Sequence, residues 1–171
     1  MAIVTGAARG LGQEYARQFA QRGANVVVCD LRNCDETLRI IKDEGAEGFS
    51  LTTDVTSEVS TLEMAAAVVD RFDAIDILVN NAALYGSLTF APFDKLDESE
   101  WDATMNVNAK GIWQCCKACV PELRAAGGGT IVNISSLAAT YGMPYALDYA
   151  MSKAAVIGIT RSLARELGRD W

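Results

Sequence analysis

Short apolar runs alternate with segments of helical period from one end of the chain to the other. This alternation is typical of a parallel β-sheet whose two faces are covered by helices. The apolar runs predict strands over residues 2–4, 25–29, 48–52, 75–80 and 130–134. We therefore expect an α/β fold built on a doubly wound parallel sheet.

Helical repeats fill the stretches between these runs. Leu11, Tyr15 and Phe19 recur every fourth residue on one face, and Gly23 follows them as a helix stop. With the strands on either side, this helix completes one βαβ unit. Further helices are expected near residues 62–69, 99–124 and 156–167, the last of them ending before Gly168.

Nothing in the sequence divides the chain into separate domains. It has no internal repeat and no Pro- or Ser-rich linker, and residues 127–129 mark a break before the last strand. A doubly wound sheet of two complete halves has six strands, one more than the sequence predicts. We expect a single domain over residues 1–171 that lacks its C-terminal strands, with residues 169–171 in the connection after a helix.

Composition removes several classes of function. The formal net charge of −7 would repel a polyphosphate backbone, so we expect no nucleic-acid partner. The sequence contains no histidine, which excludes Ser-His-Asp hydrolases and histidine-ligated zinc enzymes. We expect no metal site, and acid–base chemistry must use Tyr, Lys, Asp, Glu or Cys.

The sequence also indicates where the protein is found. No apolar run approaches the roughly 18 residues that cross a bilayer, and the N-terminus lacks the features of a secretory signal. Three of the five cysteines lie close together on one predicted helix, so we expect reduced, mostly structural thiols in a cytoplasmic protein without a membrane partner. The cysteines are Cys29, Cys34, Cys115, Cys116 and Cys119.

A glycine-rich turn joins the first predicted strand to the first predicted helix. Gly6 permits the tight turn, Gly10 lets the backbone approach a pyrophosphate, and Gly12 lets the helix lie close to the strand. The helix N-terminus favours phosphate charge. Glycines also serve simple turns, but three at a strand-to-helix junction favour a Rossmann-type dinucleotide site.

An acidic residue at the end of the second strand bears on the choice of cofactor. Asp30 lies about 20 residues beyond the glycines, where a carboxylate accepts hydrogen bonds from the adenosine ribose and repels a 2′-phosphate. Arg9 and Arg32 oppose this preference, because either guanidinium could pair with a 2′-phosphate. We expect NAD rather than NADP.

Tyr149 and Lys153 are four residues apart on a predicted helix and so share one face. A free tyrosine titrates near pH 10, and a nearby ammonium lowers that pKa. Ser135 and Ser136 end the last predicted strand, at the edge of an open α/β sheet where ligands bind. A serine hydroxyl there can hold a substrate carbonyl while a phenol donates its proton.

Taken together, these segments resemble the short-chain dehydrogenase/reductase family. The similarity runs from Thr5 to about Arg169, and the segments occur in the family's order. They are residues 5–12, Asp54-Val55, Asn80-Asn81-Ala82-Ala83, residues 106–111, Ile134-Ser135-Ser136 and residues 149–153.

The resemblance implies four catalytic residues. Tyr149 would be the general acid/base, and Ser136 would orient the substrate oxygen. Lys153 would bind the nicotinamide ribose and lower the tyrosine pKa, while Asn108 would hold a water for proton relay. The residues would together move the hydroxyl proton of an alcohol.

The resemblance also implies contacts to the adenosine half of the cofactor. Asp54 would contact adenine, helped by the Val55 backbone, and Asn81 with Ala82 would line the ribose side. Ala83 departs from the family's usual glycine, and its methyl is expected to tighten the turn without abolishing binding. The expected cofactor contacts are Gly6, Arg9, Gly10, Leu11, Gly12, Asp30, Leu31, Asp54, Val55, Asn81, Ala82, Tyr149 and Lys153.

The function that follows is an NAD(P)-dependent oxidoreductase. It would transfer hydride between the nicotinamide and a small or medium secondary alcohol or ketone. One alternative is a noncatalytic dinucleotide-binding domain, or an inactive member of the family that lacks its C-terminal third. Another is a sugar-nucleotide epimerase of the related extended family, although the spacing of Gly6, Gly10 and Gly12 speaks against it.

Two further expectations concern the substrate and the assembly. Apolar and aromatic residues flank the predicted catalytic strand and could form one wall of a substrate site, or could serve only to pack loops. They are Leu84, Tyr85, Leu137, Tyr141, Met143 and Tyr145. The helices over residues 101–124 and 149–167 are expected to pack against their copies in a homodimer or homotetramer. The apolar helix positions behind this expectation are Ile112, Trp113, Cys116, Val120, Val156, Ile157, Ile159, Thr160, Leu163 and Ala164.

Overall fold

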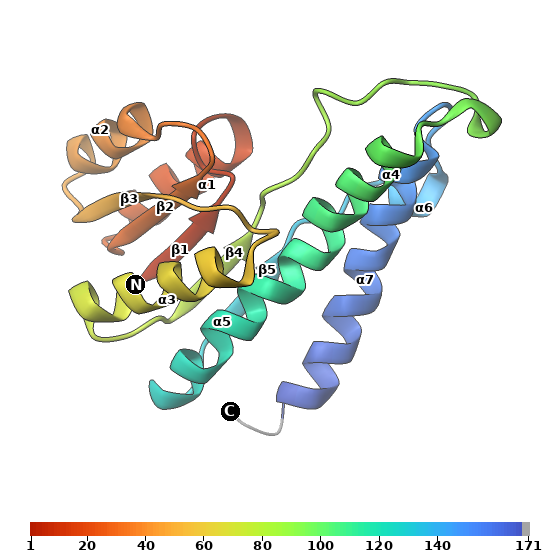
Figure 1. Cartoon of the computed structure of the whole chain (residues 1–171). Helices are drawn as coiled ribbons and strands as arrows, with labels where there is room; N and C mark the ends of the chain where they lie inside the picture. The colour runs from red at the N-terminus through yellow and green to blue at the C-terminus, as the bar shows by residue number, and fades with distance from the viewer. Residues whose placement is uncertain (169–171) are drawn as a thin grey trace.

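A parallel sheet forms the centre of the computed structural model, which describes residues 1–168 (Figure 1). Its strands are β1 (Ala2–Thr5), β2 (Val26–Asp30), β3 (Gly48–Thr52), β4 (Ile77–Asn80) and β5 (Thr130–Asn133). Their order is β3-β2-β1-β4-β5, and all neighbouring pairs are parallel. This is the order of a doubly wound dinucleotide-binding sheet, so the expected fold class is confirmed.

The predicted strands agree with the observed ones to within two residues at each end. This accuracy has a physical reason, because β1 and the first four residues of β2 are buried and so read as continuous apolar runs. The prediction for residues 169–171 lies outside the described part of the chain.

Helices occupy most of the segments between the strands and the segment after β5. They are α1 (Gly10–Gln21), α2 (Asp35–Asp43), α3 (Glu58–Phe72), the 3₁₀ turn η1 (Phe93–Lys95), α4 (Glu98–Met105), α5 (Gly111–Ala125), α6 (Ala138–Tyr141) and α7 (Leu147–Leu167). The sequence prediction missed α2. Only Thr37 and Ile41 of this helix are buried, so it carries too short an apolar repeat to be recognised.

The helix predicted over residues 99–124 is interrupted. The π turn η2 (Asn106–Lys110) separates α4 from α5. A π turn inserts an extra residue into the helical ladder and is frequent at functional sites. Here it carries Asn108, one of the residues expected to act in catalysis.

Two apolar cores lie on opposite faces of the sheet. Helices α1 and α2 cover one face, where Val4, Val28 and Ile41 are fully buried. Helices α3, α5 and α7 contribute to the core on the other face, which includes Ile3 and Leu78. At the carboxyl ends of β1, β2, β3 and β4, the segments that follow the strands line a groove, which is where ligands bind in open α/β sheets.

The face that α1 turns toward the sheet differs from the one expected. Its buried residues are Gly12, Ala16 and Ala20, whereas Leu11 is 63% exposed. Small residues allow the helix to approach the sheet closely, and the larger Phe19 packs at the margin of the core. The predicted stripe of Leu11, Tyr15 and Phe19 therefore lies at the edge of the contact between α1 and the sheet, and not at its centre.

Helix α3 shows the same kind of shift. The expected positions Leu62 and Ala66 are exposed, while Met64 and Val68 are buried. Helix α3 has apolar residues on more than one face, so the repeat alone did not select the buried one.

The described residues contain no helix that is both long and apolar enough to cross a membrane. They also contain no group of three or more acidic or thiol side chains placed to hold a metal ion.

Candidate active site

The turn between β1 and α1 has glycine where a side chain would collide or strain the backbone. Gly6 has a φ of 64°, and a Cβ there would lie 2.6 Å from the Ala82 Cα. A Cβ on Gly12 would collide with the Gly6 carbonyl oxygen. Gly10 also has a positive φ, of 62°, but the space beside it is open. The turn is therefore tightly packed underneath and accessible above.

Asn81 holds the glycine turn in place from the end of β4. Its Nδ2 donates to the carbonyl oxygens of Thr5 and Gly6, both at 3.0 Å. The Thr5 hydroxyl accepts from the backbone N–H groups of Asn81 and Ala82, each at 3.1 Å. Two segments far apart in sequence are thus joined by four hydrogen bonds at the edge of the sheet.

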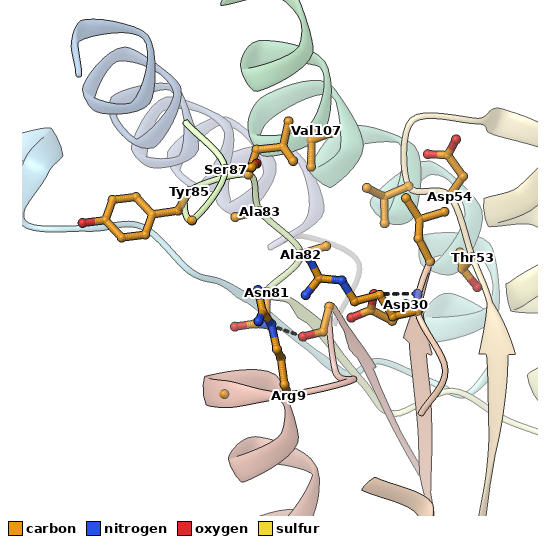
Figure 2. Close-up of a pocket in the computed structure, with 17 residues that line it drawn as sticks. Arg9, Asp30, Thr53, Asp54, Asn81, Ala82, Ala83, Tyr85, Ser87 and Val107 are labelled. Carbon is orange, nitrogen blue, oxygen red and sulfur yellow. Dashed lines mark hydrogen bonds between the residues drawn. The ribbon is translucent and has the colours of Figure 1, made fainter. Parts of the chain in front are cut away.

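Above this turn lies a groove of about 390 Å³ (Figure 2). It lies where β1 is flanked by β2 and β4, the point where strand order reverses and where dinucleotides bind in such sheets. Four expected contacts do not line it. Leu11 points to solvent and Gly12 is buried under the turn. Tyr149 and Lys153 lie on α7, outside the groove lining. The expected contacts that do line it are Gly6, Arg9, Gly10, Asp30, Leu31, Asp54, Val55, Asn81 and Ala82.

Asp30 presents a fixed carboxylate to this groove. Its Oδ2 accepts from the Ala8 backbone N–H at 3.1 Å, and its Oδ1 accepts from the Arg32 backbone N–H at 3.0 Å. The side chains of Arg9 and Arg32 line the same groove and are exposed. The lining of the groove therefore combines the oriented Asp30 carboxylate with two exposed arginine side chains.

Asp54 and Val55 line the groove from the segment that follows β3, the strand paired with β2. The Asp54 Oδ1 accepts from the backbone N–H and the hydroxyl of Thr56, at 2.9 and 2.7 Å, so this oxygen stabilises the turn into α3. Val55 is buried, and a Cβ on Gly111 would lie only 2.8 Å from its Cγ2. The start of α5 thus packs directly behind this part of the groove.

Tyr149 and Lys153 lie on one face of α7, as their spacing predicts. Lys153 is 3% exposed, and its Nζ donates to the Ile134 carbonyl oxygen at 2.8 Å. The same Nζ lies 5.9 Å from the centroid of the Tyr149 ring. Burial lowers the pKa of Lys153 to about 8, because the apolar surroundings disfavour the ammonium form.

The two serines after β5 have different partners. The Ser135 hydroxyl donates to the Lys153 carbonyl oxygen at 2.8 Å and so ties α7 to the end of the strand. The Ser136 oxygen accepts from the Ala138 N–H at 3.2 Å, at the start of α6. Ser136 also lines a pocket with Tyr149, whereas Ser135 does not. The structure thus separates a positioning serine from one that faces a ligand space.

Asn108 is fully buried, and its amide is occupied by the chain itself. Its Oδ1 accepts from the Leu84 N–H at 2.7 Å, and its Nδ2 donates to the Leu84 carbonyl at 3.1 Å. The Nδ2 also donates to the Ser152 hydroxyl at 3.0 Å. The side chain therefore connects η2, α7 and the loop after β4, and its expected part in a proton relay stays a prediction.

The family of short chain dehydrogenases matches residues 1–170. The chain belongs to this family. An oxidoreductase of unassigned specificity from Thermotoga maritima is 38% identical over 164 residues, which cover 95% of this chain and 63% of that protein. A 3-oxoacyl-[acyl-carrier-protein] reductase of Staphylococcus epidermidis is 35% identical over 169 residues, which cover 97% and 68%.

Solved structures of the family show the same fold. The carveol dehydrogenase of Mycobacterium avium in complex with NAD superposes with a TM-score of 0.94 at 28% identity, covering 99% of this chain and 66% of that one. The chain thus spans about two thirds of the length of the family members that it matches.

The short-chain dehydrogenase fold of this chain includes a buried polar pair that our sequence reasoning missed. The Thr104 hydroxyl donates to the Asp148 Oδ2 at 3.2 Å, and both residues are buried. The pair lies one helical turn from the contact between Asn108 and Ser152. Polar residues four apart on both helices were the available signal, but nothing in the sequence says which helices face each other.

A second pocket of about 260 Å³ lies beside Tyr149. Tyr85 lines both this pocket and the cofactor groove. Of the apolar residues expected beside the catalytic strand, Leu84 lines only the groove and Tyr145 lines neither space. The second pocket is lined by Tyr85, Ser136, Leu137, Ala138, Tyr141, Gly142, Met143 and Tyr149.

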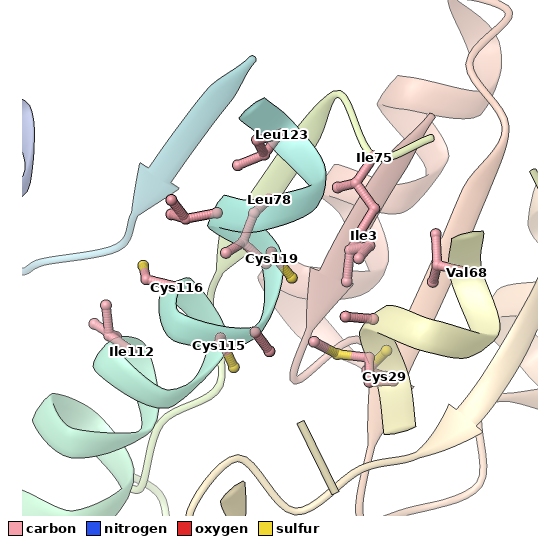
Figure 3. Packing of buried hydrophobic residues seen from close by; sticks show 14 of the residues in the cluster. Ile3, Cys29, Val68, Ile75, Leu78, Ile112, Cys115, Cys116, Cys119 and Leu123 are labelled. Atoms are coloured by element: carbon pink, nitrogen blue, oxygen red, sulfur yellow. The ribbon is translucent and has the colours of Figure 1, made fainter. Parts of the chain in front are cut away.

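The cysteines of this family member lie in the cores rather than at the site. All five are free and buried (Figure 3 shows four of them). Desolvation raises the pKa of Cys29 to about 12 and that of Cys116 to about 11. Thiols with such pKa values are weak nucleophiles at neutral pH. Their role is packing, as the sequence suggested.

Proposed function

We propose that this protein is an NAD-dependent dehydrogenase that interconverts a small or medium secondary alcohol and its ketone. The observation that carries the proposal is the position of Tyr149, which faces the second pocket while Lys153 lies buried behind it. A phenol next to a buried ammonium is suited to moving a proton near neutral pH.

In the reaction, Tyr149 and Ser136 would act on the hydroxyl or carbonyl group of the substrate, and Lys153 would act on Tyr149. When bound, the nicotinamide supplies or accepts the hydride. In ketone reduction the Tyr149 hydroxyl would donate its proton to the substrate oxygen, and in alcohol oxidation the phenolate would take it back. Ser136 would donate a hydrogen bond to the same oxygen, and the Lys153 ammonium would stabilise the phenolate.

We infer a preference for NAD over NADP from Asp30. Both carboxylate oxygens are fixed by backbone N–H groups, so the negative charge stays at the ribose end of the groove. The related carveol dehydrogenase was solved in complex with NAD, which supports the same cofactor here. Dissociation constants for NAD⁺ and NADP⁺ test the preference, and a smaller constant for NADP⁺ would contradict it.

A second candidate substrate is a 3-oxoacyl thioester. It is favoured by the 35% identity to a 3-oxoacyl-[acyl-carrier-protein] reductase. This reaction would use the same residues, because it also reduces a ketone to a secondary alcohol. The simple ketone and the 3-oxoacyl thioester differ in the groups attached to the carbonyl carbon. The residues that line the second pocket would contact those groups and so bear on which substrate is bound.

The proposal includes a homo-oligomer in the cytoplasm. The free, buried thiols support a reducing compartment, where cysteines remain unpaired. Exposed apolar surface on the helices of the site, such as Trp113 at 48% exposure, supports contact between copies.

Tyr149→Phe tests the catalytic proposal in the whole protein. Oxidation of a panel of secondary alcohols should fall by about 100-fold or more, because only the proton-transferring hydroxyl is removed. The dissociation constant for NAD⁺ should stay within about threefold. Tyr141→Phe, which removes the hydroxyl of an exposed tyrosine in the same pocket, is the control and should retain activity. Undiminished turnover by Tyr149→Phe would refute the catalytic role of Tyr149. If the unmodified protein binds NAD⁺ but turns over no alcohol or ketone, a noncatalytic dinucleotide-binding domain is favoured instead.

A further inference from the structure

Tyr85 occupies the boundary between the cofactor groove and the second pocket. Its ring centroid lies 4.7 Å from that of Tyr149, with the two planes inclined at 46°. On its other side, Phe90 meets the Tyr85 ring edge-on, with centroids 6.4 Å apart and planes at 82°. The aromatic neighbour of the proposed catalytic hydroxyl is therefore itself held by a second ring.

The backbone before Tyr85 is fixed from inside the protein. The N–H and the carbonyl of Leu84 are both bonded to the buried Asn108 amide, and the Tyr85 carbonyl accepts from the Leu88 N–H at 3.2 Å. Tyr85 thus extends from an anchored position even though its side chain is about half exposed. Its ring can serve as a fixed wall for a ligand.

The side chains that line the second pocket are all uncharged. Its lining contains no lysine, arginine, aspartate or glutamate. The polar groups are hydroxyls, and Ser136 with Tyr149 would be engaged by the reacting oxygen. Leu137 and Tyr141, at 72% and 82% exposure, add large apolar surface around it. Exposed apolar surface gathered at a pocket is a mark of ligand binding.

We propose that Tyr85 is a specificity-determining residue, which makes the pocket prefer uncharged ketones and alcohols that carry a planar or cyclic apolar group. This inference rests on the proposed function. A flat substituent on the carbonyl carbon would lie against the Tyr85 ring while its oxygen meets Ser136 and Tyr149. A substrate with an anionic carrier would find no cation in the pocket lining to pair with.

The test measures ketone binding to the complex of the whole protein with NADH, so it does not depend on turnover. Quenching of the fluorescence of bound NADH reports the affinities of acetophenone and 2-butanone, two methyl ketones that differ in the ring. Acetophenone should bind about tenfold more tightly than 2-butanone, and more tightly than acetoacetyl-coenzyme A, an anionic 3-oxoacyl thioester.

Two substitutions of Tyr85 separate the effect of its aromatic ring from the effects of its hydroxyl and its size. Tyr85→Phe should keep the ratio between acetophenone and 2-butanone within about twofold. Tyr85→Leu, which keeps an apolar side chain but removes the ring, should reduce it from about tenfold to below about threefold. The dissociation constant for NADH, measured for each variant, separates an effect on the groove, which Tyr85 also lines, from an effect on the second pocket.

The outcomes distinguish the two levels of the proposal. An unchanged ratio in Tyr85→Leu with normal NADH binding, or tighter binding of the thioester than of acetophenone, would overturn the role of Tyr85 and leave the proposed dehydrogenase standing. Failure of the unmodified protein to bind NADH would overturn the proposed function, and this inference with it.

Discussion

At the scale of single residues, Lys153 combines burial with a charge that depends on pH. Its ammonium is removed from water, and a carbonyl oxygen is its hydrogen-bond partner at 2.8 Å. The pKa of about 8 in the folded protein is lower than that of an exposed lysine, about 10.4. Between these values the unfolded chain binds the proton and the folded chain does not. Stability should therefore rise as pH increases from about 8 to about 10.

Lys153→Met tests this dependence through the free energy of unfolding. At pH 7 the variant should be more stable by about 1 to 2 kcal/mol, because a buried charge is replaced by an apolar side chain of similar length. The contribution of this site to the rise in stability above pH 8 should disappear with it. Urea unfolding of both proteins at pH 7 and pH 9.5 gives the four values. A variant that keeps the full pH dependence would show that Lys153 is not its source.

At the scale of elements, α7 is clamped to the helices before it by two buried polar contacts. Thr104 with Asp148, and Asn108 with Ser152, bridge α4 and η2 to α7 at matched four-residue intervals. Asp148 and Ser152 each directly precede one of the two proposed catalytic residues of α7. We infer that the clamp fixes the rotation of α7 and the direction of the proposed catalytic side chains.

Removing one donor should weaken this clamp. Thr104→Val keeps the shape of the side chain but leaves the buried Asp148 carboxylate without this hydrogen bond, which should cost about 1 to 3 kcal/mol in urea unfolding. Turnover should fall while the dissociation constant for NAD⁺ stays unchanged. Thr140→Val, at an exposed position, should change stability by less than about 0.5 kcal/mol. Equal effects of the two substitutions would argue against the clamp.

At the scale of the whole molecule, part of the apolar helix surface that was expected to contact a partner subunit is buried inside the single chain. Ile112 and Val156 are buried in the core of the single chain, as are Cys116 and Val120. Other expected positions remain available, and Trp113 is 48% exposed with the Lys117 ammonium 5.5 Å from its ring centroid. The expected helical interface is thus narrower than the apolar pattern suggests, and it remains a prediction.

Trp113→Glu should convert the proposed oligomer to smaller species. A carboxylate in the centre of a twofold contact meets its own copy, and burying two like charges is unfavourable. Light scattering on dilute protein should show a drop in molar mass relative to the unmodified protein. Val59→Glu, on the exposed side of α3, is a matched control and should leave the mass unchanged. An unmodified protein that is a monomer and still turns over substrate would refute the interface.

The sequence by itself determined the features that depend on local chemistry. Strands buried on both faces read as continuous apolar runs, and the glycine spacing predicted the turn above which the groove lies. The four-residue spacing of Tyr149 and Lys153 placed them on one helix face without reference to the rest of the fold. These features follow from backbone geometry that neighbours in the chain largely set.

Only the tertiary structure decided what depends on contacts between distant segments. It brought small residues of α1, such as Ala16, against the sheet. It bonded the Ser135 hydroxyl to α7 and placed Ser136 in the lining of the second pocket. It paired the Asn108 amide with the Leu84 backbone by hydrogen bonds. It also placed Tyr85 against Tyr149, 64 residues further along the chain. Several partners compete for each such side chain, and which contact forms is selected by the packing of the complete sheet and its helices.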